Sequence, residues 1–344
     1  MTSESRPREK LQTTFLFAIT AFLLLVLLYP PSIRAVTLLT LLNVLILNPV
    51  IQFLETKKIP RLLGILLLYA FLSIFFLFGV TRLIQVISLQ WSGFIDSLPA
   101  LSDSVLNKVG EIEARLKEHL GIEVNLGSYL SINQWLTQIR SWALTHIPAI
   151  LGNLASAALL VPVFSFFLLK DGDTFMRLYL QLIPKRFSRT ATSVIRKITT
   201  ALGTFLRAKL LEAALFGLMT YLGMIVLKAP YPGLFALIGG LLNFIPYLGP
   251  ILGAAPPLLI FAFSSTHQHL FWPAVILLLI VNLIDNFLIF PVFVAKIVNL
   301  TPLTLLLSVA VGQEIYGVAG MLVAVPLASI FKIIYLEIQP ILYK

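Results

Sequence analysis

Cysteine is absent from this 344-residue chain, and its absence excludes several kinds of site. Without thiols the chain forms neither a disulfide framework nor a Cys-ligated metal or iron–sulfur centre. The four histidines are scattered and form no HExxH motif, and no GxxxxGK[ST] phosphate-binding loop occurs. ATP hydrolysis through such a loop is therefore excluded, and we expect no enzymatic activity, no metal site and no cofactor.

Charged residues are also scarce. They make up 12% of the chain, against 58% hydrophobic residues and a mean hydropathy of +0.96. These values predict an all-α, polytopic integral membrane protein. The formal net charge is +10, but the Lys and Arg residues lie mostly in short segments that flank apolar runs. That distribution is the positive-inside signal of membrane topology, so no nucleic-acid partner is expected.

Residues 1–89 are predicted to form N-terminal transmembrane helices that serve as a scaffold. Apolar runs occupy 11–29, 35–54 and 62–80. The first run is longer than a signal-peptide core and lacks a small-residue cleavage site, so we expect it to be retained. Basic clusters before the first and third runs place the N-terminus in the cytoplasm.

Residues 90–146 are predicted to form an extramembrane helical insert on the outer face, because hydrophobicity falls there and acidic residues gather. Apolar side chains at three- and four-residue steps predict an amphipathic helix that ends at Gly121. A second, short helix is predicted over 132–144. The sequence leaves open whether the insert is a lid, a subunit contact or an interfacial ledge. The apolar positions are Leu101, Val105, Val109, Ile112, Leu116 and Leu120.

Residues 147–204 are predicted to hold a fourth span, over 147–169, and a basic cytoplasmic segment. Nine basic residues and two acids lie between Lys170 and Lys209, which is the strongest cytoplasmic signal in the chain. The two acids, at 171 and 173, are too few for a dedicated cation site. We interpret them as part of a helix-capping turn.

Residues 205–344 are predicted to form the core transport unit. The segment 230–257 is apolar enough for a bilayer, yet it is rich in Pro and Gly. Each Pro removes a backbone donor and disrupts the preceding turn, so an uninterrupted helix is not expected. The segment 302–336 is interrupted in the same way, and one apolar helix, over 273–295, separates the two. Broken helices at membrane depth persist where they are buried or line a cavity, which predicts a transport pathway.

Two arrangements of these broken segments are open. If each is a re-entrant hairpin, six helices cross the membrane and the hairpins enter from opposite faces, as in the inverted repeats of many secondary transporters. If each broken segment crosses the membrane, the total is eight. The termini are cytoplasmic in both arrangements, and the lack of Lys and Arg in 264–270 favours the hairpins. A kinked helix whose Pro and Gly serve only packing is the alternative for each segment.

Polar and helix-breaking residues of the core are the candidates for the pathway. They are Asn243, Pro246, Tyr247, Gly249, Pro250, Gly253, Asn282, Asn286, Pro291, Gly317, Gly320 and Pro326.

Three acids in apolar surroundings, Asp285, Glu314 and Glu212, are candidates for coupling to an ion. An ionised carboxylate at the centre of a membrane helix costs about 2.5–3.5 kcal/mol, so it usually faces a cavity, a partner or an ion path. We hypothesise that Asp285 or Glu314 carries a proton or a sodium ion. Asp285 forms a polar patch with its neighbours Asn282 and Asn286, without an adjacent basic residue. Lys209 and Arg207 lie within about a turn of Glu212 and offer it an ion pair, and a buried hydrogen bond or salt bridge is the structural alternative for each acid.

Several motifs carry a family resemblance. They are Phe-x-x-Lys-Asp-Gly at 167–172, Phe-Ile-Pro-Tyr-Leu-Gly-Pro at 244–250, Asp-Asn at 285–286, Leu-Thr-Pro-Leu at 300–303, Gln-Glu at 313–314 before Gly317, and the run from Gly320 to Pro326. Through them the chain resembles the autoinducer-2 exporter family of bacterial permeases over nearly its whole length. It departs from the family pattern at Lys209, Ala295 and Thr301.

The resemblance implies a multi-pass protein of the inner membrane that forms homo-oligomers among membrane lipids. It also implies export of autoinducer-2 or sodium/proton antiport. We expect export of a small polar solute, coupled to a proton or sodium gradient. A monovalent cation/proton antiporter is the alternative within transport, and a structural or regulatory membrane protein is the alternative from another class.

Overall fold

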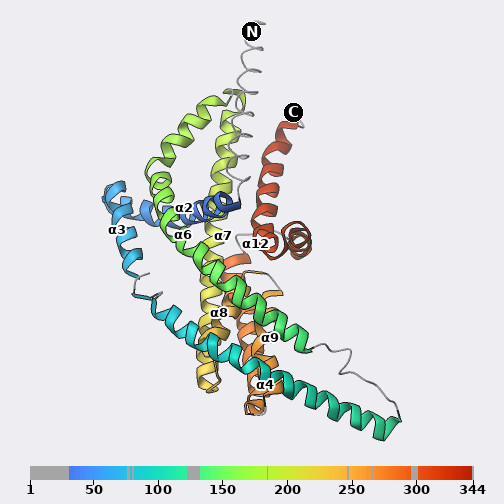
Figure 1. The fold of residues 1–344 in the computed structure, drawn as a ribbon. Helices are drawn as coiled ribbons and strands as arrows, with labels where there is room; N and C mark the ends of the chain where they lie inside the picture. Colours follow the sequence, from blue (N-terminus) through green and yellow to red (C-terminus); the bar gives the residue numbers. More distant parts are fainter. Residues whose placement is uncertain are drawn as a thin grey trace. The chain divides into compact units, whose positions relative to one another are not determined.

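The structure is a computed structural model that describes residues 31–75, 78–79, 81–121, 132–183, 185–245, 248–264, 266–295 and 301–342. Every regular element in these ranges is a helix, which confirms the all-α prediction. The elements are α2 (Pro31–Thr56), α3 (Arg61–Phe75), α4 (Thr81–Leu120), α6 (Ile132–Leu182), α7 (Lys185–Val226), α8 (Pro232–Leu242), α9 (Leu248–Phe263), η2 (Gln268–Leu270), α10 (Phe271–Ile284), η3 (Asp285–Ile289), η4 (Pro291–Ala295) and α12 (Pro302–Leu342), shown in Figure 1. The predicted apolar run 11–29 lies outside the described residues.

The described residues fall into two compact units. The first unit draws on 1–75, 153–208 and 294–344, and the second on 76–152 and 209–293. Both α6 and α7 contribute residues to each unit.

In the first unit, α2 and α3 pack together and against α6. A tight turn joins α2 to α3, with Lys58 in the left-handed conformation at φ 66°. The core between these helices consists of Leu47, Ile51, Ile65 and Leu169. Two half-buried polar contacts cross it, because the hydroxyl of Tyr69 lies 2.5 Å from Ser165 Oγ and 3.2 Å from Asn43 Oδ1.

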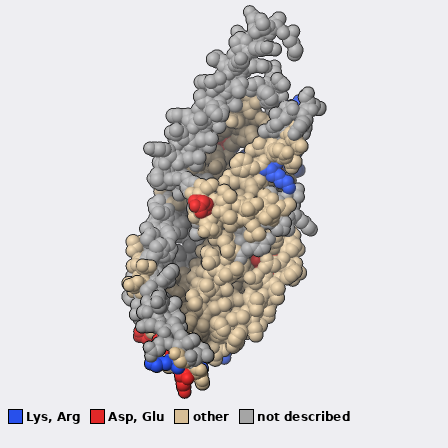
Figure 2. Space-filling view, turned by 90° about the vertical axis from the view of Figure 1, so that its right-hand side faces the viewer, with Lys and Arg blue, Asp and Glu red and all other residues tan. Residues whose placement is uncertain are grey.

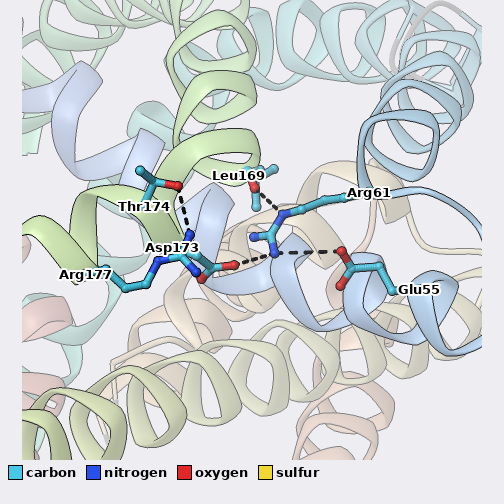
Figure 3. Close-up of polar contacts among 6 residues, drawn as sticks. All are labelled: Glu55, Arg61, Leu169, Asp173, Thr174 and Arg177. Atoms are coloured by element: carbon cyan, nitrogen blue, oxygen red, sulfur yellow. Dashed lines mark hydrogen bonds and ion pairs between the residues drawn. The ribbon is translucent and has the colours of Figure 1, made fainter.

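Arg61, at the start of α3, ties this helix to α6 (Figure 3). Its Nε donates to the carbonyl of Leu169 at 2.7 Å, and its Nη1 donates to Asp173 Oδ2 at 2.5 Å and lies 3.8 Å from Glu55 Oε1. α6 passes unbroken through residues 170–173, so the predicted helix-capping turn is wrong. The single Gly172 costs a helix only about 1 kcal/mol, which packing overrides, and Asp173 serves instead as the partner of Arg61.

Two long helices, α4 and α6, run through the predicted outer insert. α4 ends at Leu120, which confirms the predicted helix end, and Gly121 follows in the left-handed conformation at φ 63°. A helix begins at Ile132 as predicted, but its predicted end at residue 144 is wrong, because α6 continues to Leu182 as one element of 51 residues. The polarity of the sequence changes near residue 147, but a change in polarity does not by itself end a helix.

The first broken segment folds into two helices, α8 and α9, as its Pro and Gly content predicts. α8 and α9 pack side by side and cross closely at two glycines. A Cβ atom added to Gly253 would lie only 2.9 Å from the Cα atom of Gly239, so the crossing requires glycine there. α8, α9 and the residues that join them are called the hairpin below.

The second broken segment also folds back on itself, within α12. Gly317 has φ 60°, which a regular right-handed helix does not contain. A Cβ atom on Gly312 would lie 2.5 Å from the carbonyl oxygen of Gly320, although eight residues of straight helix span about 12 Å. The two arms of α12 therefore meet across a turn at Gly317, and Figure 1 shows them running in different directions.

α4, α8, α9 and α10 form the core of the second unit. Aromatic rings of Phe94, Tyr231, Phe235 and Phe261 form an edge-to-face chain with centroid separations of 6.2, 6.2 and 6.0 Å. Edge-to-face pairs add specific attraction to apolar burial, so this chain holds α4 against the hairpin.

Three helical stretches in the described residues are long and apolar enough to cross a membrane: Leu39–Thr56, Ser188–Val226 and Gln268–Phe293. Shorter apolar helices lie at Arg61–Phe75, Pro232–Leu242, Leu248–Phe263 and Leu303–Ile315. The face in Figure 2 carries few charged residues among its described atoms. α10 also exposes Ile276, Leu279, Ile280 and Leu283, an apolar surface of the kind that membrane helices present.

Candidate functional site

A cluster of four polar side chains lies buried in the second unit. Lys209 and Glu212 belong to α7, Asn243 follows α8, and Asp285 begins η3. Their exposed fractions are 2%, 1%, 2% and 3%, respectively. We call these four residues the polar cluster.

Lys209 and Glu212 form the ion pair of the cluster. Lys209 Nζ donates to Glu212 Oε1 at 2.9 Å, across one turn of α7. Removing two charges from water is expensive, so such a pair persists only when each group finds partners for its remaining atoms. The predicted partner Lys209 is confirmed, whereas Arg207 donates to Leu45 O at 3.0 Å and to Thr204 Oγ1 at 3.2 Å.

Asp285 joins the cluster from a different helix. Asn243 Nδ2 donates to Asp285 Oδ2 at 3.4 Å, which is a long hydrogen bond. The positive charge of Lys209 also acts on Asp285, and the negative charge of Asp285 acts on Glu212. Tertiary structure thus brings the positive charge of Lys209 to bear on Asp285, although no basic residue adjoins Asp285 in its own helix.

Two acceptor atoms of the cluster have no donor within the described part of the chain. They are Glu212 Oε2 and Asp285 Oδ1, and both are buried. Buried carboxylate oxygens are normally hydrogen-bonded, and each exception needs a physical explanation. When all three charged groups are ionised, one ammonium group faces two carboxylates, and the cluster carries a net charge of −1. The arrangement can therefore accept one proton or one monovalent cation.

The backbone is irregular where Asp285 enters the cluster. α10 ends at Ile284, and the next turn is a π-helix in which the N–H of Phe290 bonds to the carbonyl of Asp285. Pro291 then begins a second π-helical turn, η4, and it has no N–H to donate. π-Helical turns occur frequently at functional sites, where they redirect side chains.

Asn282 and Asn286 do not join the polar cluster as partners of Asp285. Asn286 Nδ2 donates to the carbonyl of Asn282 at 2.9 Å and also to its side-chain oxygen, and Asn286 is exposed. Asn286 thus points away from buried Asp285, because successive residues of a helix point in different directions.

Close glycine contacts bring α7 and the hairpin together beside the cluster. A Cβ atom on Gly240 would lie 2.9 Å from the carbonyl oxygen of Ala213, the residue after Glu212. A Cβ atom on Gly249 would overlap the carbonyl oxygen of Leu242. Small residues at these positions let the backbones approach closely, and this approach carries Asn243 to the buried acids.

The other candidate residues have varied positions. Gly249, Pro250 and Gly253 lie in α9, with Gly249 and Gly253 buried. Pro246 and Tyr247 lie outside the described residues. Glu314, Gly317, Gly320 and Pro326 lie in α12 of the first unit, and Glu314 is exposed there.

Lys209 is the cluster residue that the sequence-based site prediction did not include. Lys209 lies three residues before Glu212 in a mostly apolar stretch, and this spacing indicates that the two charged side chains pair with each other. Nothing in the local sequence, however, links this pair to Asp285.

The long apolar helices, the exposed apolar surface and the buried charges among broken helices define a polytopic membrane protein with a polar site in its interior. The chain belongs to the AI-2E family of transporters, because the sequence profile described as "AI-2E family transporter" matches residues 17–339. This membership confirms the resemblance seen in the sequence motifs.

Curated relatives cover most of the chain. YueF of Bacillus subtilis (strain 168), which is named as a transport protein, is 28% identical over 300 residues, covering 85% of this chain and 80% of YueF. The AI-2 transport protein TqsA of Escherichia coli (strain K12) is 25% identical over 306 residues, covering 86% of this chain and 83% of TqsA. PerM of the same strain, named as a permease, is 27% identical over 282 residues, covering 78% of this chain and 74% of PerM. The names of all three describe transport.

Proposed function

We propose that this protein exports a small polar solute, such as autoinducer-2, across the inner membrane, and that a proton or sodium gradient drives the export. Family membership supports the transport role. The name of TqsA supports autoinducer-2 as a solute to test first. The coupling proposal rests on one observation, the buried excess of carboxylates over ammonium groups in the polar cluster.

The charge of the cluster supplies the physical basis for coupling. Lys209 compensates one carboxylate, and the second needs a proton or a monovalent cation. An uncompensated buried charge costs several kcal/mol. The cluster with a bound proton or cation is therefore stable in a buried conformation, whereas the cluster without one favours a conformation in which the charge reaches water. A ligand shifts a conformational equilibrium by its difference in affinity for the two states. Binding of a proton or cation at Glu212 and Asp285 would therefore drive a structural change.

The broken helices are the part of the structure that responds to a change of charge at Asp285. Asn243 stands where α8 ends, and its side chain contacts Asp285 where α10 gives way to η3. Loss of negative charge at Asp285 weakens its attraction for the Asn243 amide, because hydrogen bonds to ionised acceptors are the stronger kind. The end of α8 is in this way linked to the ionisation of Asp285. In this proposal residues 205–344 are the transport core and residues 1–89 the scaffold.

Antiport of a monovalent cation against protons is the second candidate function. Glu212 Oε2 and Asp285 Oδ1, which have no donor among the described residues, favour it, because they offer ligands to a cation without any solute. Glu314 is kept as a further candidate for ion coupling, and the predicted pathway residues are kept as candidates for contact with the solute. The proposal also includes cytoplasmic termini, a homo-oligomer and contact with membrane lipids.

Transport in proteoliposomes tests the proposal. Purified protein is reconstituted, and efflux of autoinducer-2 and other small polar solutes is followed with and without imposed proton and sodium gradients. We expect gradient-dependent efflux that falls at least tenfold in Asp285→Asn and Glu212→Gln, with Glu118→Gln on exposed α4 surface as the control. Cation/proton exchange without any solute would favour the antiporter. Gradient-driven transport that survives in both cluster variants and falls in Glu314→Gln would move the coupling role to Glu314.

A further inference from the structure

α4 contacts the hairpin through three polar groups spread along its length. The side-chain oxygen of Gln90 accepts a hydrogen bond from the backbone N–H of Leu234 at 2.9 Å. The carbonyl of Gly93 accepts one from the hydroxyl of Tyr231 at 2.8 Å. Further along, Lys108 Nζ donates to the carbonyl of Ala262 at 2.5 Å.

Two of these contacts satisfy the open ends of the hairpin helices. The first N–H groups of a helix and its last carbonyls have no partner within the helix. Leu234 lies in the first turn of α8, and no side chain at the Tyr231 N-cap satisfies that turn. Ala262 lies in the last turn of α9. Gln90 and Lys108 therefore cap the two helices from outside, and the positive charge of Lys108 suits the negative end of the α9 dipole.

Apolar contacts reinforce the same arrangement. The Lys108 ammonium lies 5.6 Å from the centroid of the Phe263 ring, and the ring of Phe94 packs edge-on against Tyr231. Figure 1 shows α4 passing the ends of α8 and α9 that lie away from their connection. Since α4 meets both helices, it constrains the direction of the hairpin as well as its position.

We propose that α4 is a clamp on the hairpin, and that Gln90 and Lys108 are positioning residues for transport. Gln90 and Lys108 hold the start of α8 and the end of α9. In this way they fix the position of the opposite end of the hairpin, where Asn243 donates its hydrogen bond to Asp285. This inference rests on the proposed role of the polar cluster, although neither Gln90 nor Lys108 touches it. The predicted outer insert thereby gains a defined task, which is to fix the geometry of the site from outside it.

Spin labels measure this geometry directly. Because the chain has no cysteine, Leu241→Cys and Leu283→Cys provide two unique labelling sites, with parent side chains 60% and 53% exposed. The distance distribution between the labels is recorded by pulsed electron paramagnetic resonance in lipid nanodiscs, in the full chain. The test variants are Lys108→Met and Gln90→Leu, the rescue variants are Lys108→Arg and Gln90→Glu, and Arg115→Met on exposed α4 surface is the control.

We expect Lys108→Met to broaden the distribution and to raise the displaced population about tenfold, the scale of one hydrogen bond to a charged group. Solute efflux in proteoliposomes should fall with it, and Lys108→Arg should restore both. An unchanged distribution in both Lys108→Met and Gln90→Leu would overturn the clamp. A broadened distribution with unchanged efflux would overturn the positioning role.

Failure of the proposed function is a separate outcome. If Asp285→Asn and Glu212→Gln leave gradient-driven efflux unchanged while Lys108→Met broadens the distribution and lowers efflux, the cluster is not the coupling site and the clamp stands. If Lys108→Met elutes as a monodisperse protein and keeps its melting temperature, the change in the distance distribution is local and does not come from misfolding. If that variant fails to fold, Gln90→Leu provides the same test at the α8 end.

Discussion

Asn243 donates a hydrogen bond to Asp285 across 42 residues of chain, and this contact joins the end of α8 to the π-helical turn that follows α10. Both residues are buried, and one oxygen of Asp285 has no donor among the described residues. The contact links a helix break to an acid that can change its charge.

Asn243→Leu should impair both transport and stability. Without the amide, neither oxygen of Asp285 has a hydrogen-bond donor among the residues that the structure describes, and an unsatisfied buried acceptor costs about 1–3 kcal/mol. We expect transport to fall about tenfold and the melting temperature in detergent to decrease. Gln138→Leu is the matched control, because that amide side chain is exposed on α6 and belongs to no candidate site. Full transport by Asn243→Leu would separate Asn243 from the mechanism.

Lys209 and Glu212 should show strong coupling in a double-mutant cycle. Lys209→Met leaves two buried carboxylates without their shared ammonium and should destabilise the protein by about 3–5 kcal/mol. Glu212→Gln should cost less, because Lys209 can then compensate Asp285. The double variant Lys209→Met/Glu212→Gln should be more stable than Lys209→Met alone, as measured by thermal unfolding in nanodiscs. Additive effects of the two substitutions would show that the pair does not act as a unit.

The glycine crossing in the hairpin should not tolerate a larger side chain. A Cβ atom on Gly253 would meet the Cα atom of Gly239 at 2.9 Å, so Gly253→Val forces the two helices apart. Overpacking of this kind costs about 1–3 kcal/mol and should also lower transport. Ala255→Val, on an exposed side of α9, is the control for added volume. Equal melting temperatures of the two variants would mean that the hairpin adapts to the larger side chain.

Two glycines should respond to alanine in opposite directions. Gly317 has φ 60°, where an alanine costs roughly 1–2 kcal/mol, so Gly317→Ala should lower the melting temperature. Gly110 lies within α4 with open space around it, so Gly110→Ala should raise stability by about 0.5–1 kcal/mol. A stabilising Gly317→Ala would indicate that α12 straightens through this position.

Thiol labelling should locate the loop after α9. The hairpin arrangement predicted from charge places residues 264–270 on the outer face, so Thr266→Cys should react with an impermeant thiol reagent added to intact cells. Thr56→Cys, next to the basic residues Lys57 and Lys58, should react only after the membrane is permeabilised. Labelling of Thr266→Cys from the inside alone would favour eight crossings.

Several local features follow from sequence rules. Gly121 ends α4, and the Pro and Gly residues between 230 and 257 separate α8 from α9. The three-residue spacing of Lys209 and Glu212 indicates their pair. Each of these rules acts over a few residues, so these features can be predicted without knowing how the helices pack.

Other features depend on neighbours that are distant in sequence. Polarity changes near residue 147 without a break in α6, and Asp173 pairs with Arg61 rather than capping a helix. Asp285 has polar neighbours at 282 and 286, yet its hydrogen bond comes from Asn243 and its positive neighbour is Lys209.

Composition and the placement of helix breakers were thus enough to establish a helical membrane protein and to locate its interruptions, because hydrophobic burial in lipid and backbone geometry are local properties. Which buried charges share one site was decided by the packing of α7, the hairpin and α10. Close backbone contacts at glycines permit that packing, and no rule of sequence spacing predicts which helices approach one another.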